Sequence, residues 1–156
     1  MWDTILATLR AEFSDVPDTE QVTRILIRLL LAAVLGGLLG YERESKGKAA
    51  GIRTHMLVAL GAAMFVLVPE LDGMQVADMS RVIQGIVTGI GFLGAGAIIK
   101  RASEEDVQGL TTAAGIWMTA AIGVACGLGR ETTAVLATLL SLGVLAVVPH
   151  IVDRRR

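Results

Sequence analysis

The side chains with the most varied chemistry lie where one long apolar segment ends and the next begins. They combine carboxylates, guanidinium groups, a hydroxyl and an imidazole: Glu42, Arg43, Glu44, Arg53, Thr54 and His55. Such groups could form a functional polar cluster at one face of a membrane. They do not predict a shared metal chelate, because carboxylates two residues apart on a helix, such as Glu42 and Glu44, point to roughly opposite sides.

A purely structural interpretation of this region stays open. Glu42 and Lys46 are four residues apart, like Glu44 and Lys48, which is the spacing of ion pairs on a solvated helix. His55 belongs to no His-rich metal-binding spacing, and an isolated histidine near a membrane interface typically forms local hydrogen bonds. We therefore expect no metal, no cofactor and no catalytic centre.

Arg28 is the deepest charge in the first apolar segment, one helical turn after Arg24. A charge in lipid is costly, so the default expectation is that this long side chain reaches the membrane interface. The alternative is that Arg28 pairs with a carboxylate of another helix or lines a polar cavity. The sequence identifies no partner.

Glycine is concentrated in the third apolar segment, at Gly85, Gly89, Gly91, Gly94 and Gly96. Glycines four residues apart, as in Gly36–Gly40 and Gly123–Gly127, let helices approach closely in lipid. We expect tight packing within the chain or between subunits. A second interpretation is that residues 91–96 interrupt the helix and expose backbone carbonyls to an ion.

The fourth apolar segment carries polar groups that favour helix contacts. Thr111 and Thr112 can hydrogen-bond between helices or to their own helix. Trp117 lies near the middle of the segment, away from the interfacial aromatic belts, and is expected to pack. Cys126 is the one cysteine, and its apolar surroundings predict a buried, inert thiol. The letters G-I-G-F-L-G at 89–94 lack the strand–turn–helix context of a dinucleotide site.

Five apolar segments must position these residues. The chain is 53% hydrophobic and 19% charged, and the charges cluster between segments at about 22–41, 54–68, 82–99, 110–128 and 132–152. A bilayer core of about 30 Å needs about 20 helical residues. These lengths predict an all-α integral membrane protein with about five transmembrane helices in a domain covering 21–153.

Residues 1–20 form a separate N-terminal segment. Apolar side chains recur at spacings of three and four within it, at Trp2, Ile5, Leu6, Leu9 and Phe13. This pattern predicts a short amphipathic helix. The helix could lie in the membrane interface or pack on its own protein, and the sequence favours neither. Its acidic start is not that of a signal peptide.

Charge sets the expected orientation. Nine of the 14 Lys and Arg residues fall on the side shared by the first and third loops and the C-terminal tail. The positive-inside rule therefore predicts an outer N-terminus and a cytoplasmic C-terminus in a bacterial inner membrane. The net charge of −1 gives no basic surface for nucleic acid.

Four sequence blocks, in order, resemble the MgtC/SapB family of bacterial inner-membrane proteins, from about Arg28 to Val148. The blocks begin at Gly36 (GGLLGYERE), Gly51 (GIRTHMLVALG), Gly89 (GIGFLGAG) and Gly109 (GLTTAAGIW). The resemblance marks as motif residues Glu42, Arg43, Glu44, Arg53, Thr54, His55, Gly91, Gly94, Gly96, Thr111, Thr112 and Trp117. It does not give the chemistry of each.

The resemblance implies a non-enzymatic regulator linked to magnesium limitation and membrane energetics. The founding member is described as an inhibitor of the F-type ATP synthase, which makes that enzyme an implied partner, beside a homodimer or other homo-oligomer in the bilayer. Longer members carry a soluble C-terminal domain. The rival hypothesis is an oligomeric ion or solute transporter with a site at the glycine-rich third segment. Against it, no segment interior contains the carboxylate that a divalent cation prefers.

Overall fold

The computed structural model describes residues 1–14, 18–99 and 109–153, excluding the side chains of Ile99 and of residues 149–153. Every described element is an α-helix: α1 (Trp2–Glu12), α2 (Thr19–Ser45), α3 (Ile52–Leu71), α4 (Val76–Ile99), α5 (Leu110–Gly127) and α6 (Glu131–Asp153). Lys100, Arg101, the side chain of His150 and the last three arginines lie outside what is described.

Five helices of the described chain, α2 to α6, are long and apolar enough to cross a membrane. This confirms the predicted fold class. Most helices begin before and end after the segments expected from the sequence. The largest difference is at the start of α4, which begins at Val76 rather than near residue 82. The side chain of Asp18 accepts a hydrogen bond from the backbone N–H of Gln21 at 2.7 Å, which caps the start of α2.

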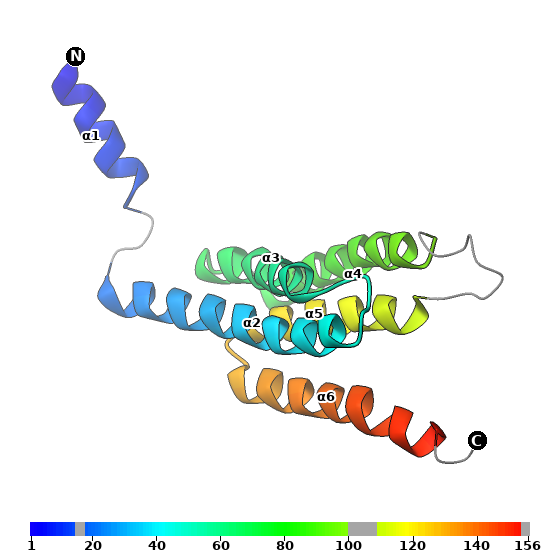
Figure 1. Cartoon of the computed structure of the whole chain (residues 1–156). Helices are drawn as coiled ribbons and strands as arrows, with labels where there is room; N and C mark the ends of the chain where they lie inside the picture. Colours follow the sequence, from blue (N-terminus) through cyan, green and yellow to red (C-terminus); the bar gives the residue numbers. More distant parts are fainter. Residues whose placement is uncertain (15–17, 100–108, 154–156) are drawn as a thin grey trace.

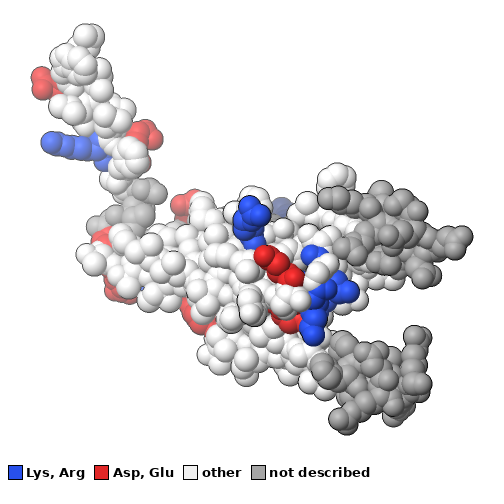
Figure 2. All heavy atoms as spheres, viewed as in Figure 1, with Lys and Arg blue, Asp and Glu red and all other residues white. Residues whose placement is uncertain are grey.

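The helices run alternately between two ends of the bundle (Figure 1). We call the end where α2 begins the Arg28 end, and the end where α2 stops and α3 begins the His55 end. On the face in Figure 2, the Lys and Arg side chains of the bundle gather toward the His55 end. Between the two ends, residues 29–41 of α2, 56–69 of α3 and 82–99 of α4 include no charged residue, as expected where lipid surrounds the helices.

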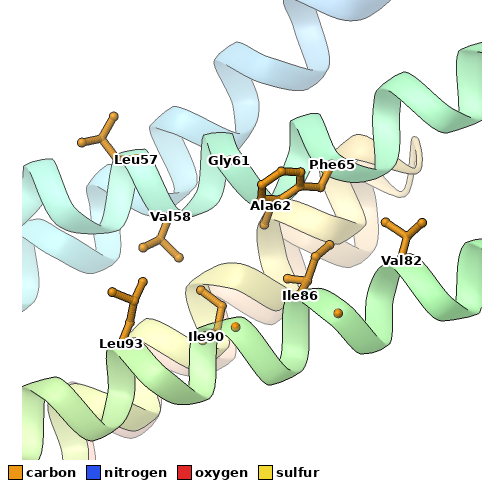
Figure 3. Close-up of a pocket in the computed structure, with 11 residues that line it drawn as sticks. Leu57, Val58, Gly61, Ala62, Phe65, Val82, Ile86, Ile90 and Leu93 are labelled. Carbon is orange, nitrogen blue, oxygen red and sulfur yellow. The ribbon is translucent and has the colours of Figure 1, made fainter.

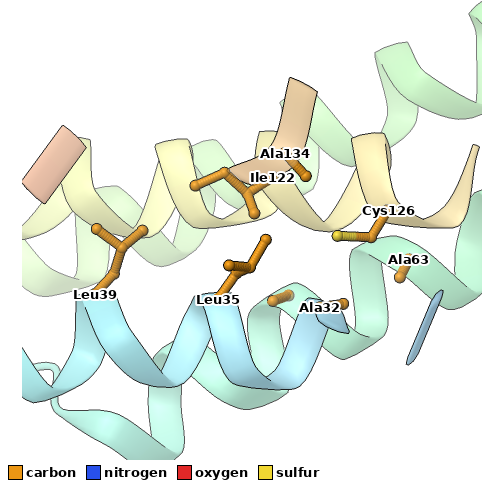
Figure 4. Packing of buried hydrophobic residues seen from close by; sticks show 8 residues of the cluster. Ala32, Leu35, Leu39, Ala63, Ile122, Cys126 and Ala134 are labelled. Atoms are coloured by element: carbon orange, nitrogen blue, oxygen red, sulfur yellow. The ribbon is translucent and has the colours of Figure 1, made fainter. Parts of the chain in front are cut away.

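α5 lies at the centre and contacts α2, α3, α4 and α6. Small and branched apolar residues fill the space around it (Figure 4): Ala32, Leu35, Leu39, Ala59, Ala63, Ile122, Cys126 and Ala134. Cys126 is fully buried, as predicted. α4 is peripheral. Only 6% of its most apolar stretch is buried inside the described chain, whereas the share for α5 is 44%.

Candidate functional site

Arg28 forms the buried polar centre of the Arg28 end. Its side chain is only 9% exposed. Nη1 donates to Oε2 of Glu70 at 2.8 Å and to the carbonyl oxygen of Gly127 at 3.0 Å. Nε lies 3.8 Å from Oε1 of Glu131. Arg28 therefore joins α2 to the end of α3, the end of α5 and the start of α6.

Arg28 thus has the carboxylate on another helix that the alternative expectation required, and all of its partners lie at helix ends. Its guanidinium turns inward because the short α5–α6 connection leaves room for it. Gly129 adopts a φ of +67° there, and a Cβ at this residue would collide with the Arg28 guanidinium. Sequence reasoning missed Glu70 and Glu131, although their positions at helix ends on the same side as Arg28 were a usable signal.

At the His55 end, Glu42 and Arg43 form an ion pair with each other. Both side chains are largely buried, with exposures of 13% and 5%. The second carboxylate oxygen of Glu42, Oε1, is buried without a hydrogen bond among the described atoms. The expected solvated pair of Glu42 with Lys46 does not form, because the helix ends at Ser45 and Glu42 turns toward Arg43.

Glu44 stabilises the start of α3. Its Oε2 accepts a hydrogen bond from the backbone N–H of Ile52 at 2.9 Å. The N-cap residue of α3 is Gly51, which has no side chain to satisfy the free N–H groups of the first turn. The expected pair of Glu44 with Lys48 is therefore replaced by a helix cap across the α2–α3 turn.

His55 is fully buried one turn into α3. Its Nδ1 lies 3.0 Å from the carbonyl oxygen of Gly51, so Nδ1 carries the proton and donates. Its Nε2 is buried without a hydrogen-bond partner in the described chain. The ring forms part of the wall of a cavity of about 360 Å³, bordered by α2, α3, α5 and α6.

The structure brings together only part of the predicted polar cluster. Glu42 and Arg43 are paired with each other, and His55 is buried one turn into α3. Arg53 and Thr54, by contrast, are exposed on the first turn of α3. On α5, Thr111 is exposed and lines the His55 cavity, whereas Thr112 is buried. Trp117 is 49% exposed, so much of its ring faces outward from the bundle.

The glycine pairs of α2 and α5 are close contacts within the chain. A Cβ at Gly36 would lie 2.7 Å from the carbonyl oxygen of His55, and one at Gly40 would lie 2.6 Å from the Cα of Ile52. A Cβ at Gly123 or Gly127 would collide with carbonyl oxygens of α3. Packing inside the chain therefore accounts for these four glycines.

The glycines of α4 behave differently. Gly94 is buried against Ala113 of α5, where a Cβ would lie 3.5 Å from the Ala113 Cβ. At the other four positions, a Cβ would meet no atom of the described chain within 4 Å: Gly85, Gly89, Gly91 and Gly96. α4 is also one continuous helix through residues 91–96. The interpretation that these residues interrupt the helix is wrong.

α3 and α4 diverge to leave an apolar groove of about 620 Å³ (Figure 3). We call it the α3/α4 groove. Its lining residues are Leu57, Val58, Gly61, Ala62, Phe65, Val82, Gly85, Ile86, Gly89, Ile90 and Leu93. No side chain among them is charged, and Gly61, Gly85 and Gly89 leave backbone uncovered along it.

No group of His, Cys, Asp and Glu side chains in the described ranges could hold a metal ion. The arrangement combines a polar centre at each end, built around a largely buried arginine, with an open apolar groove on one side. Its geometry suits helix contact better than ion coordination, because hard cations require several converging oxygen ligands.

Five apolar helices with charged ends define a multi-pass inner-membrane protein. The model of the MgtC family matches residues 29–154, and the chain belongs to this family.

Curated relatives agree. The chain is 43% identical over 129 residues to the "Putative magnesium transporter YhiD" of Escherichia coli strain K12, covering 78% of this chain and 59% of that protein. It is 46% identical over 122 residues to Protein MgtC of Brucella abortus, covering 78% and 50%. Against Protein SrpB of Synechococcus elongatus it is 43% identical over 126 residues, covering 74% and 69%. No solved structure is significantly similar.

Proposed function

We propose that this chain is a non-enzymatic regulator in the bacterial inner membrane, linked to magnesium limitation and membrane energetics. Its family membership and the magnesium in the name of YhiD support the link to magnesium. None of the three relatives' names describes an enzyme. The chain spans 59% of YhiD and 50% of Brucella MgtC, so the activity of the longer proteins is carried over as part of this proposal.

The observation that carries the proposal is the α3/α4 groove. Helices associate in a membrane through close packing, and exposed small residues allow the backbone of a second helix to approach closely. Gly85 and Gly89 present such a surface with open space above each Cα. We propose that α4 of a second copy occupies the groove, because α4 carries the same small-residue face and a two-fold contact makes that face complementary to itself. The F-type ATP synthase, implied by the resemblance, is the proposed target of the dimer.

The experiment is cross-linking of the purified protein in vesicles with three leucine variants. Gly89→Leu fills the groove, while Gly143→Leu adds the same bulk to α6 at another open glycine. We expect Gly89→Leu to raise the dissociation constant of the dimer about tenfold, as about 1.4 kcal/mol of lost packing would do, and Gly143→Leu to leave it unchanged. Gly94→Leu should instead disturb the monomer, because Gly94 faces Ala113. Full dimer yield in Gly89→Leu would contradict the proposal.

A transporter is the second candidate, favoured by the name of YhiD. The interiors of the five helices carry no Asp or Glu, and α4 is not broken to free carbonyl oxygens. Flux of magnesium and protons into vesicles holding the protein separates the two. No flux from folded protein supports the regulator, whereas protein-dependent flux that Gly89→Leu abolishes supports the transporter.

The orientation is also part of the proposal. We propose that the His55 end faces the cytoplasm and the Arg28 end faces outward, as the distribution of Lys and Arg predicts. Under this arrangement, the Glu42–Arg43 pair lies at the cytoplasmic face and the Arg28 centre lies at the outer face.

A further inference from the structure

α1 has an unpartnered apolar face. Every described residue of the helix and of its end is exposed. α1 contacts no other helix of the described chain, and it projects away from the bundle (Figure 1). The prediction that it might pack on its own bundle is therefore not what the structure shows, and its apolar side chains need another partner.

The apolar face is narrow and continuous. At 3.6 residues per turn, the five side chains fall within an arc of about 100°: Trp2, Ile5, Leu6, Leu9 and Phe13, with exposures between 42% and 82%. Asp3 and Arg10 lie on one border of this arc and Glu12 on the other. Ala7 and Ala11 lie opposite the arc. This is the pattern of a helix that lies flat on a boundary between apolar and aqueous phases.

The small number of residues between α1 and α2 determines where α1 can meet a boundary between apolar and aqueous phases. Phe13 and Thr19 are six residues apart, so their Cα atoms are at most about 21 Å apart. Thr19 opens α2, whose first turns are polar, with an exposed ion pair between Glu20 and Arg24 at 2.8 Å. The apolar part of α2 begins directly after Arg24. The membrane surface thus lies near residues 19–24, and α1 cannot leave its neighbourhood.

We propose that α1 lies in the membrane–water interface beside the Arg28 end, with its apolar arc in the lipid. Its side-chain charges are two acidic and one basic, Asp3, Glu12 and Arg10. Attraction to anionic lipid therefore contributes nothing, and burial of the apolar arc holds the helix. The binding is insensitive to salt and to the charge of the headgroups. It also ties the start of α2 to the membrane surface.

The experiment uses the full chain with Trp117→Phe, which leaves Trp2 as its one tryptophan. The protein is placed in phosphatidylcholine vesicles, and Trp2 fluorescence is quenched from the water by acrylamide and from the lipid by brominated acyl chains. We expect a blue-shifted emission, strong quenching by bromine near the headgroups and weak quenching by acrylamide. Neither 1 M salt nor added anionic lipid should change this result.

Two matched variants give the control. Leu6→Glu places a charge in the apolar arc, and Ala7→Glu places the same charge on the opposite face. We expect Leu6→Glu to expose Trp2 to acrylamide and Ala7→Glu to leave it in the lipid. Strong acrylamide quenching of the parent protein would overturn the proposal, since α1 would then be in water. Protection from both quenchers would also overturn it, because α1 would then pack on protein.

Discussion

Arg28 and Glu70 are joined by a hydrogen-bonded ion pair of 2.8 Å, although they lie 42 residues apart on different helices. Only 9% of the Arg28 side chain is exposed, so the pair is shielded from water on the side of the arginine. An arginine buried in this way is costly unless it is paired. Glu70 therefore has a structural role that its place at a helix end does not reveal.

We expect Glu70→Ala to lower the free energy of unfolding by about 2 kcal/mol, the usual value for a hydrogen bond to a charged group. The loss is moderated because Glu131 remains near Arg28 Nε. The matched control is Glu20→Ala, which removes the exposed pair with Arg24 and should cost less than about 1 kcal/mol. Circular dichroism during unfolding in mixed detergent micelles measures both. Equal losses would show that burial of Arg28 adds nothing to its pairing.

Gly36→Ala should destabilise the bundle by about 1–3 kcal/mol, as overpacking of a close contact does. The new Cβ would lie 2.7 Å from the carbonyl oxygen of His55 and 2.8 Å from the Cβ of Ala59, so α2 and α3 would have to separate. Gly143→Ala meets nothing within 4 Å and should be neutral or slightly stabilising. The same micelle titration compares them, and a neutral Gly36→Ala would refute the close approach.

Glu44→Ala should remove the cap on the first turn of α3 and cost about 1 kcal/mol. The substitution should affect the first turn of α3 more than the stability of the whole bundle, because the backbone N–H of Ile52 loses its acceptor. We expect faster hydrogen exchange at Ile52 in Glu44→Ala and near-normal exchange in Glu44→Gln, whose amide oxygen can still accept. Unchanged exchange in the alanine variant would mean that water replaces the cap without cost.

A reporter fused after Arg156 tests the orientation. Because the chain has five candidate spans, a cytoplasmic signal there requires an outer N-terminus. We expect cytoplasmic fluorescence and no activity from a reporter that works only outside the membrane. The reverse result would place the His55 end outside, and the roles proposed for the two ends would have to be exchanged.

The sequence predicts the helices well and their side-chain partners poorly. Hydropathy depends on residue types alone, so it located all five spans and the amphipathic α1. The partners of Arg28 depend instead on how α2, α3 and α6 cross, and Glu70 and Glu131 are distant from it in the chain.

The glycines illustrate the same limit. Gly36–Gly40 and Gly85–Gly89 have the same spacing, yet the first pair is covered by α3 and the second is open. Spacing shows that a helix face is small, but it does not show which neighbour covers that face. The cap formed by Glu44 was also hidden, because it depends on the path of the α2–α3 turn.

The unequal lengths of α4 and α5 have a consequence for how α4 lies in the bilayer. α5 has 18 residues and spans about 27 Å, while α4 has 24 residues and spans about 36 Å. The first turns of α4 carry Asp78 and Arg81, which form an exposed ion pair, so the uncharged part of α4 begins at Val82. That part, residues 82–99, has 18 residues and is as long as α5, slightly shorter than a hydrocarbon core of about 30 Å. We therefore expect the extra polar turns of α4 to lie in the membrane interface at the Arg28 end, beyond the hydrocarbon core.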